Sequence, residues 1–204
     1  MDKRYEILDG LPTYGEMAIP IVDEDDIFVS EGYVVKFYKD DGSGWIANFP
    51  KGSSQLSFVK EFDNHTILVI AGGEGYIMNP NQEKPIKEFY NLIENIVELD
   101  DGGLIFATIT DIVHLDKSGI ILWEKEDIFW DGIKDLSIVG NKLVGYCFDI
   151  TTKKDEESWK KFIINLETQK MEGGCTPIKL KNKLWHRYIW VVGFFFLLFY
   201  QLSR

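Results

Sequence analysis

Apolar and polar residues alternate in short runs over most of the chain, and these runs recur with a period of about forty residues. The apolar segments that mark the period lie 40, 37 and 39 residues apart and begin at Ile27, Ile67, Leu104 and Leu143. Residues with β-branched or aromatic side chains dominate the runs, which is typical of strands on a pleated surface. The pattern therefore predicts four similar β-units.

The third unit shows the predicted strands most completely. It spans about 33 residues, with candidate strands at 93–99, 104–109, 111–115 and 120–125. The turns within it include Asp100–Gly103 and Asp116–Gly119, whose Asp and Gly residues favour tight reversals of the chain. Units of about forty residues with four strands each are typical of propeller blades.

The other three units fit the same frame and together account for residues 17–174. In the first unit we expect strands at 17–22, 26–30, 33–38 and 44–49. In the second we expect strands at 56–62, 66–71, 75–79 and, less regularly, 86–90. In the fourth we expect strands at 133–139, 142–148, 159–166 and 169–174. The predicted fold is all-β, with four repeat units forming propeller-like antiparallel sheets.

One stretch also fits a helix. Apolar residues recur at helical spacing between Ile86 and Val97, and Pro85 stands where a first-turn proline would suit a helix. Asn91 and Asn95 interrupt this stretch, and a strand interpretation keeps the third unit in frame. We therefore favour strands, with a helix of about twelve residues as the alternative.

The C-terminal region differs from the rest of the chain because residues 188–203 contain no charged side chain. As a helix, this run would extend roughly 24 Å, which approaches the hydrocarbon thickness of about 30 Å. We predict a transmembrane tail anchor there, preceded by a basic juxtamembrane linker at 178–187. The side chains expected at the membrane interface are those of Lys183, Trp185, Arg187, Tyr188, Trp190 and Tyr200.

The distribution of basic residues predicts the orientation of this anchor. Basic residues precede the apolar run and only Arg204 follows it, so the positive-inside rule places the N-terminal domain in the cytoplasm. The first residues contain no apolar signal-peptide core. For the apolar run, a buried strand, a segment lying in the membrane surface and an unselected extension remain alternatives.

The net charge of the chain limits the classes of partner that it can bind. Residues 178–204 contain five basic residues and no acidic one, so residues 1–177 hold 33 acids and 17 bases, a net charge of −16. Such a domain repels phosphate backbones, which excludes nucleic acid as a direct partner. An anionic leaflet also repels it, so we expect residues 1–177, a single soluble β-repeat domain, to stand away from the bilayer.

Residues that could support catalysis or bind a metal are few and scattered. Cys147 and Cys175 are expected to be reduced thiols, with Cys147 a small core residue. His114 is expected to be an exposed or hydrogen-bonded strand residue, since no second ligand lies at metal-binding spacing. The glycine-rich segment 72–75 lacks the Lys and Ser/Thr of a phosphate loop and predicts a hairpin turn. We predict no catalytic residue, no metal and no cofactor.

A longer pattern surrounds the tetrapeptide Trp-Asp-Gly-Ile at 130–133. It includes Trp123, Leu136, Ile138, Gly140, Gly145, Trp159, Phe162, Leu166, Gly173 and Gly174. In this pattern, residues 60–174 resemble a family of small uncharacterised bacterial propeller-like proteins. The resemblance implies a β fold and a bacterial source, and it carries no activity.

Two classes of function remain. The first is a non-catalytic protein-binding module tethered to a membrane, whose protein partner the sequence does not identify. Aromatic residues beside turns often anchor binding hot spots, which makes candidates of Trp45, Tyr76, Trp130 and Trp159. The alternative is a carboxylate-dependent hydrolase with a sugar-like substrate at the mouth of the propeller channel. That chemistry requires two carboxylates within about 5–9.5 Å of each other.

Overall fold

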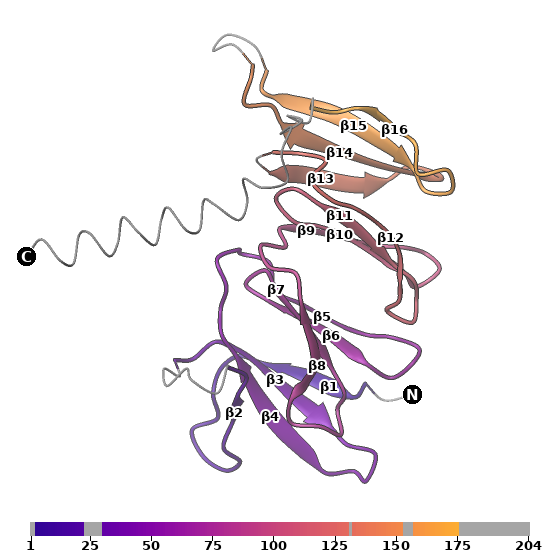
Figure 1. The fold of residues 1–204 in the computed structure, drawn as a ribbon. Helices are drawn as coiled ribbons and strands as arrows, with labels where there is room; N and C mark the ends of the chain where they lie inside the picture. The colour runs from indigo at the N-terminus through magenta and orange to yellow at the C-terminus, as the bar shows by residue number, and fades with distance from the viewer. Residues whose placement is uncertain (1–2, 23–29, 131, 153–156, 176–204) are drawn as a thin grey trace, which may run out of the picture.

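The computed structural model describes residues 3–22, 30–130, 132–152 and 157–175. All regular secondary structure in these ranges is β, with sixteen strands in four sheets of four strands each (Figure 1). The prediction of an all-β fold built from four repeat units is therefore confirmed.

The first sheet is irregular. Its strands, in spatial order, are β1 (Tyr5–Leu8), β3 (Tyr33–Tyr38), β4 (Gly44–Phe49) and β2 (Ile19–Pro20). β2 pairs in parallel with β4, whereas the other two pairings are antiparallel. Since proline cannot donate a ladder hydrogen bond, Pro20 suits the edge position of β2. Only two residues of the predicted strand 17–22 pair, β1 was not among the predicted strands, and 26–30 lies mostly outside the described residues.

The other three sheets are antiparallel meanders in chain order. The second sheet consists of β5 (Phe58–Glu61), β6 (Ile67–Ala71), β7 (Glu74–Met78) and β8 (Pro85–Phe89). The third consists of β9 (Asn95–Glu98), β10 (Leu104–Ala107), β11 (Ile112–Leu115) and β12 (Ile121–Lys125). The fourth consists of β13 (Ile133–Ile138), β14 (Lys142–Phe148), β15 (Trp159–Asn165) and β16 (Met171–Gly173). Each of these meanders has the strand order of a propeller blade.

The ambiguous stretch 85–97 forms the strands β8 and β9, so the strand interpretation is confirmed. Tyr90 and Leu92 have φ angles of 50° and 57°, in the left-handed region, and they turn the chain from one sheet to the next. The backbone of Ile93 then donates to the carbonyl of Gly73, at 2.9 Å. The helical spacing of apolar residues was a coincidence of two strands joined by a short link.

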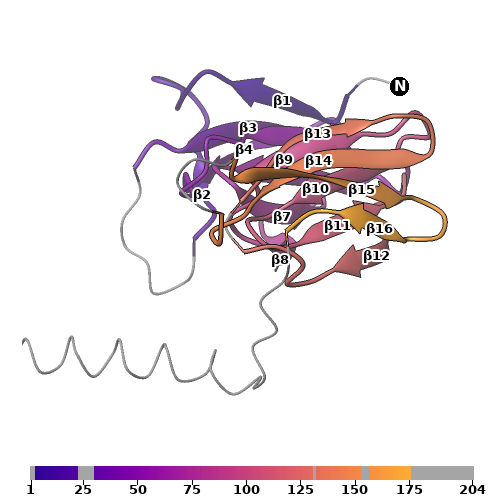
Figure 2. The same ribbon diagram turned by 90° about the horizontal axis from the view of Figure 1, so that it is seen from above.

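Hydrophobic clusters fill the spaces between successive sheets, so the sheets stack face to face (Figure 1). Seen along the stack, the sheets overlie one another (Figure 2). Each of the three clusters joins one neighbouring pair, and their central side chains include Phe49 and Met78, Ile70 and Phe106, and Ile105 and Phe162. Among the described residues, no core cluster joins the first sheet to the fourth. The four sheets therefore form an open stack with three interfaces.

The first strands of the four sheets lie along one edge of the stack. Contacts between successive sheets run along this edge: Tyr5 Oη donates to Val59 O (3.1 Å), Lys60 Nζ lies 2.7 Å from Glu98 Oε2, and Asn95 Nδ2 donates to Ile133 O. In a propeller the first strand of each blade likewise lies nearest the axis. The stack is therefore propeller-like, with β1, β5, β9 and β13 at its inner edge.

The expectation of reduced cysteines is wrong. Cys147 on β14 and Cys175 form a disulfide, with their Cα atoms 6.2 Å apart. Gly173 and Gly174 both have positive φ angles, and they turn the chain after β16 back towards the core of the fourth sheet. This turn places Cys175 N at 2.9 Å from Cys147 Sγ. The sequence spacing of the two cysteines gave no sign of the reversal.

The predicted membrane segments lie beyond the described residues. None of the described ranges contains a helix long and apolar enough to cross a bilayer. The predicted anchor at 188–203 and linker at 178–187 fall outside these ranges and stay predictions.

Candidate binding surface

Two of the four predicted partner-binding residues are in the core. Trp45 is 2% exposed and Tyr76 is 5% exposed, and both lie in the cluster between the first and second sheets. The Trp45 indole N–H donates to the carbonyl of Pro80, at 2.8 Å. Strand alternation turns both side chains into the interface rather than towards solvent. The prediction that these two aromatics lie on the surface is wrong.

The other two predicted residues do reach the surface. Trp130 is 36% exposed in the segment before β13, and Trp159 is half-buried at the start of β15. Lys134 Nζ lies 4.2 Å from the centroid of the Trp159 ring, and Phe148 packs edge-on against the same ring. A role for Trp130 and Trp159 in partner binding stays a prediction.

His114 also differs from its expectation. It is 8% exposed, and neither ring nitrogen has a hydrogen-bond partner among the described residues. Its ring meets Trp123 edge to face, with centroids 5.2 Å apart. Burial lowers the pKa of the imidazole below its ordinary value, although the charges of Asp101 and Asp116 act in the opposite direction. His114 is therefore a buried neutral side chain rather than an exposed or hydrogen-bonded one.

The most distinctive local structure is the link between β8 and β9. The Tyr90 ring packs against Phe106 and Phe89, with centroids 5.2 Å and 5.4 Å away, and its hydroxyl donates to Glu124. Burial, and then the hydrogen bond and negative charge of Glu124, raise the pKa of Tyr90 well above its ordinary value. Left-handed backbone at a non-glycine residue costs about 1–3 kcal/mol and is common at binding sites. Tyr90 thus has an unfavourable backbone conformation, and its ring and hydroxyl make contacts that stabilise it.

Asp111 organises the neighbouring loops. Its carboxylate accepts hydrogen bonds from the hydroxyls of Thr108 (3.2 Å) and Thr110 (2.9 Å) and from the backbone of Asp127 (2.8 Å). The carbonyl of Thr110 also accepts from the backbone of Ile128, at 3.1 Å. These bonds fix the turn between β10 and β11 against the segment before β13.

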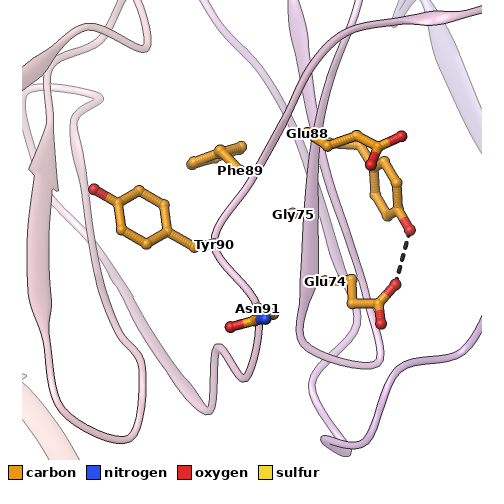
Figure 3. A pocket seen from close by; sticks show the side chains of 7 residues that line it. Glu74, Gly75, Glu88, Phe89, Tyr90 and Asn91 are labelled. Atoms are coloured by element: carbon orange, nitrogen blue, oxygen red, sulfur yellow. Dashed lines mark hydrogen bonds between the residues drawn. The ribbon is translucent and has the colours of Figure 1, made fainter. Parts of the chain in front are cut away.

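Two hollows flank the link, and Tyr90 and Asn91 line both. The larger hollow has a volume of about 550 Å³ and is lined by Glu74, Gly75, Tyr76, Glu88, Phe89, Tyr90 and Asn91 (Figure 3). The smaller has a volume of about 220 Å³ and is lined by Tyr90, Asn91, Leu92, Thr108, Ile109, Thr110 and Asp111. We call the two together the acidic hollows, because their charged lining residues are all carboxylates.

The geometry of the larger hollow suits a cationic group. Figure 3 shows Glu88 and Glu74 on one side of the β8 backbone and the rings of Phe89 and Tyr90 on the other side, where they pack against the core between the second and third sheets. The Tyr76 hydroxyl donates to Glu74 Oε2, at 2.9 Å, which orients that carboxylate. The two carboxylates attract an ammonium or guanidinium group. No cluster of three or more metal-ligating side chains occurs among the described residues.

Sequence reasoning missed the acidic hollows. Glu74 and Glu88 belong to different strands, and Asp111 belongs to another sheet. Only the register of β7 with β8, which pairs Tyr76 with Glu88, brings the first two carboxylates to one hollow. Little in the sequence indicated the link, because its two left-handed residues are Tyr90 and Leu92, types that rarely adopt this conformation.

No protein-family model and no curated protein matches the sequence. Solved structures with a similar fold include a protein of unknown function from Bacteroides caccae, with 14% sequence identity and a TM-score of 0.37. The matched region covers 66% of this chain and 56% of that one. For virginiamycin B lyase from Staphylococcus aureus the identity is 16% and the TM-score 0.38, and the match covers 74% of this chain and 52% of the lyase. For the Neurospora crassa Pan2 WD40 domain the identity is 14% and the TM-score 0.37, and the match covers 72% of this chain and 49% of that domain.

The chain spans about half the length of each of these solved chains. Likeness at these TM-scores carries no argument about function. The resemblance to small bacterial propeller-like proteins with the Trp-Asp-Gly-Ile motif stays a prediction, and Asp131 of that motif lies outside the described residues.

Proposed function

We propose that this protein is a non-catalytic binding module whose acidic hollows receive a basic segment of a partner protein. The observation that carries the proposal is the lining of the hollows. Glu74, Glu88 and Asp111 line them together with Phe89 and Tyr90, and no lining residue is basic. Such a surface attracts lysine and arginine side chains and disfavours acidic segments.

Exposed apolar residues beside the hollows would supply the anchoring contacts. Leu92 is 37% exposed and lines the smaller hollow, and Trp130 is 36% exposed in a segment that Asp111 and Thr110 hold in place. Binding hot spots commonly combine an apolar or aromatic anchor with a surrounding polar rim. We therefore expect a partner segment that combines basic residues with at least one large apolar side chain.

The proposal includes attachment to a membrane. Its support is the uncharged run 188–203 and the basic linker 178–187 before it. In this proposal the N-terminal domain lies in the cytoplasm, because basic residues precede the apolar run. The disulfide between Cys147 and Cys175 is the observation that opposes this orientation, since such bonds are rare in that compartment. Alkaline carbonate extraction tests the attachment, because an anchored chain stays in the membrane pellet and a truncation at residue 177 is released. Release of both chains to the same extent would contradict the anchor.

A peptide array tests the binding proposal. The array carries synthetic segments in which lysine or arginine is placed at varied distances from one leucine or tryptophan. The full-length protein should bind a subset of the basic segments, and Glu88→Gln should reduce this binding several-fold. Glu167→Gln is the matched control, because Glu167 is exposed in the turn between β15 and β16, far along the chain from the hollows.

The same variants address the hydrolase alternative. Glu74 and Glu88 line one hollow, and a carboxylate-dependent hydrolase would require such a pair at a separation of about 5–9.5 Å. Hydrolysis of a glycoside or ester panel that disappears in Glu88→Gln, together with an array that shows no charge preference, would replace the binding proposal. Binding of basic segments without hydrolysis would support it.

A further inference from the structure

The fourth sheet ends the stack, and its outer face combines apolar residues with lysines. Leu143, Cys147 and Phe162 are buried in the core between the third and fourth sheets, so the alternate residues of β14 and β15 point outward. The outward apolar side chains are all half-buried and are Val144, Tyr146, Phe148, Trp159 and Ile163. The outward charged side chains are Lys134, Lys142, Lys161 and Glu172, and the exposed Asp135 lies in the β13 bulge next to Lys134.

The lysines on this face lie next to aromatic rings. Lys134 Nζ is 4.2 Å from the centroid of the Trp159 ring, and Lys134 and Lys161 flank Tyr146 in the strand register. Lysine and aromatic side chains combine an apolar body with a polar tip, which suits the boundary between water and hydrocarbon. The face therefore has the chemistry of a surface that rests on lipid headgroups.

The acidic charge of the domain does not prevent such a contact. Sheets that pack face to face lie about 10 Å apart. Screening reduces charge interactions beyond about 8 Å at physiological ionic strength. The carboxylates of the first three sheets therefore lie behind the fourth sheet at distances where their repulsion is weak. We expected residues 1–177 to stand away from the bilayer because of their net charge of −16. That expectation assumes that the charge is spread evenly over the surface of the domain.

We propose that the outer face of the fourth sheet rests on an anionic lipid surface. Charge complementarity favours this occupant, since Lys134, Lys142 and Lys161 outnumber the acids Glu172 and Asp135 at the face. The disulfide also fixes Cys175 to the fourth sheet, and the sequence that follows is basic and then apolar. The proposal rests in part on the proposed tether, because the tether would bring this sheet to the bilayer.

A second copy of the chain is a poorer occupant of this face. Two copies related by a twofold axis would bring the same lysines together, which costs free energy by like-charge repulsion. The outer face of the first sheet offers no comparable surface, because Val34 and Ile46 on it are buried. An acidic protein remains the competing class of partner, and the experiment distinguishes it.

Lysine acetylation of the full-length protein tests the proposal. The protein is mixed with vesicles of phosphatidylcholine alone or with added phosphatidylserine, and flotation measures binding. Mass spectrometry then gives the labelling rate of each lysine. We expect Lys142 and Lys161 to react at least about five-fold more slowly on phosphatidylserine vesicles than on phosphatidylcholine vesicles. The rates at the exposed residues Lys51 and Lys87 should not differ.

The outcomes separate this proposal from the tether. Flotation with both vesicles and equal labelling would overturn the lipid-facing sheet and leave the tether. Flotation only with phosphatidylserine, with Lys142 and Lys161 protected, would support the sheet and contradict the tether. Flotation with neither would overturn both. Protection by soluble polyglutamate, without protection by phosphatidylserine vesicles, would assign the face to an acidic protein.

A pair of variants adds a matched control. Lys134→Glu with Lys142→Glu removes two lysines from the face and should abolish the protection of Lys161. Lys51→Glu with Lys87→Glu makes the same change in net charge elsewhere and should leave Lys161 protected. Equal loss of protection in both double variants would show an effect of net charge alone and would overturn the proposal.

Discussion

The two ends of the stack are finished differently. On the outer face of the first sheet, Val34 and Ile46 are 1% and 5% exposed although no further sheet among the described residues covers them. The chain itself provides part of the cover, since Asn48 bonds to the backbone of Ser30 and Gly32. On the outer face of the fourth sheet, the apolar residues stay half-buried beside lysines. Stacked repeats need terminal units with modified outer faces, and here the apolar residues of one outer face are buried whereas those of the other stay partly exposed. We call these the capped end and the uncapped end of the stack.

The largest effect should come from the glycine that closes the capped end. A Cβ atom at Gly32 would lie 1.8 Å from the carbonyl oxygen of Phe49, so Gly32→Ala must displace the cap or β4. We expect a loss of about 4 kcal/mol or more in the free energy of unfolding, measured by urea denaturation.

The matched variant at the uncapped end is Gly140→Ala, in the turn between β13 and β14. A Cβ atom there meets nothing within 4 Å, and only the φ angle of 59° opposes it. The expected loss is about 1 kcal/mol. Equal losses at Gly32 and Gly140 would show that the first sheet has no tight cap.

The uncapped end should depend on its covalent link. The disulfide between Cys147 and Cys175 closes a segment with a sequence separation of 28 residues. Loop-closure entropy for such a segment corresponds to about 3.5 kcal/mol. We expect Cys147→Ala with Cys175→Ala to lower the free energy of unfolding by that amount. Thermal unfolding of the unchanged sequence with and without reductant measures the stabilisation by the same disulfide. An unchanged midpoint temperature would contradict a stabilising disulfide.

Loss of the Asn48 side-chain amide in the first sheet should lower the free energy of unfolding more than loss of the Asn165 amide in the fourth sheet. Asn48 is 3% exposed, accepts from Gly32 N at 2.8 Å and donates to Ser30 O at 2.9 Å. Asn48→Ala should cost about 2 kcal/mol, because the part-buried hydrogen bonds to the backbone of Ser30 and Gly32 are both lost. Asn165 accepts from Thr168 N at 2.8 Å in an exposed turn of the fourth sheet, so Asn165→Ala should cost less than about 1 kcal/mol. Urea denaturation of both variants tests whether the difference has this sign.

The smallest effect should be a dependence on pH at the interface that the fourth sheet covers. Burial lowers the pKa of His114 in the folded state. Its unfolded value is about 6.5, so the unfolded state takes up a proton first as the pH falls below that value. Above it, both states are neutral and His114 has no effect. The free energy of unfolding should therefore fall between pH 7 and pH 5, and His114→Phe should reduce this slope. Identical slopes in both proteins would contradict the burial of a neutral imidazole.

The repeat was visible in the sequence because strand alternation and turn residues are local. Strands 104–107, 112–115 and 142–148 lie within a few residues of their predicted positions. The first sheet was less predictable, because β1 joins it from the N-terminal side and β2 enters in parallel. Those pairings depend on contacts between distant segments, which alternation does not report.

The candidate site was less predictable than the fold. Trp45 and Tyr76 were chosen as surface aromatics, but sheet stacking buries one face of every internal strand. The disulfide depends on two consecutive positive φ angles at Gly173 and Gly174. The acidic hollows depend on the register of β7 with β8 and on the link at Tyr90. Each of these features is set by tertiary geometry that the residue types alone leave open.

The central claim is that the acidic hollows, rather than the lysine-bearing end of the stack, recognise a basic protein segment. The most direct test is a titration of the full-length protein with an arginine-rich peptide and with the same peptide after every arginine is replaced by glutamate. The arginine peptide should bind, its affinity should fall about ten-fold between low and high salt, and Glu74→Gln with Glu88→Gln should abolish most of the binding. Equal or tighter binding of the glutamate peptide, or unchanged binding in the double variant, would contradict the account.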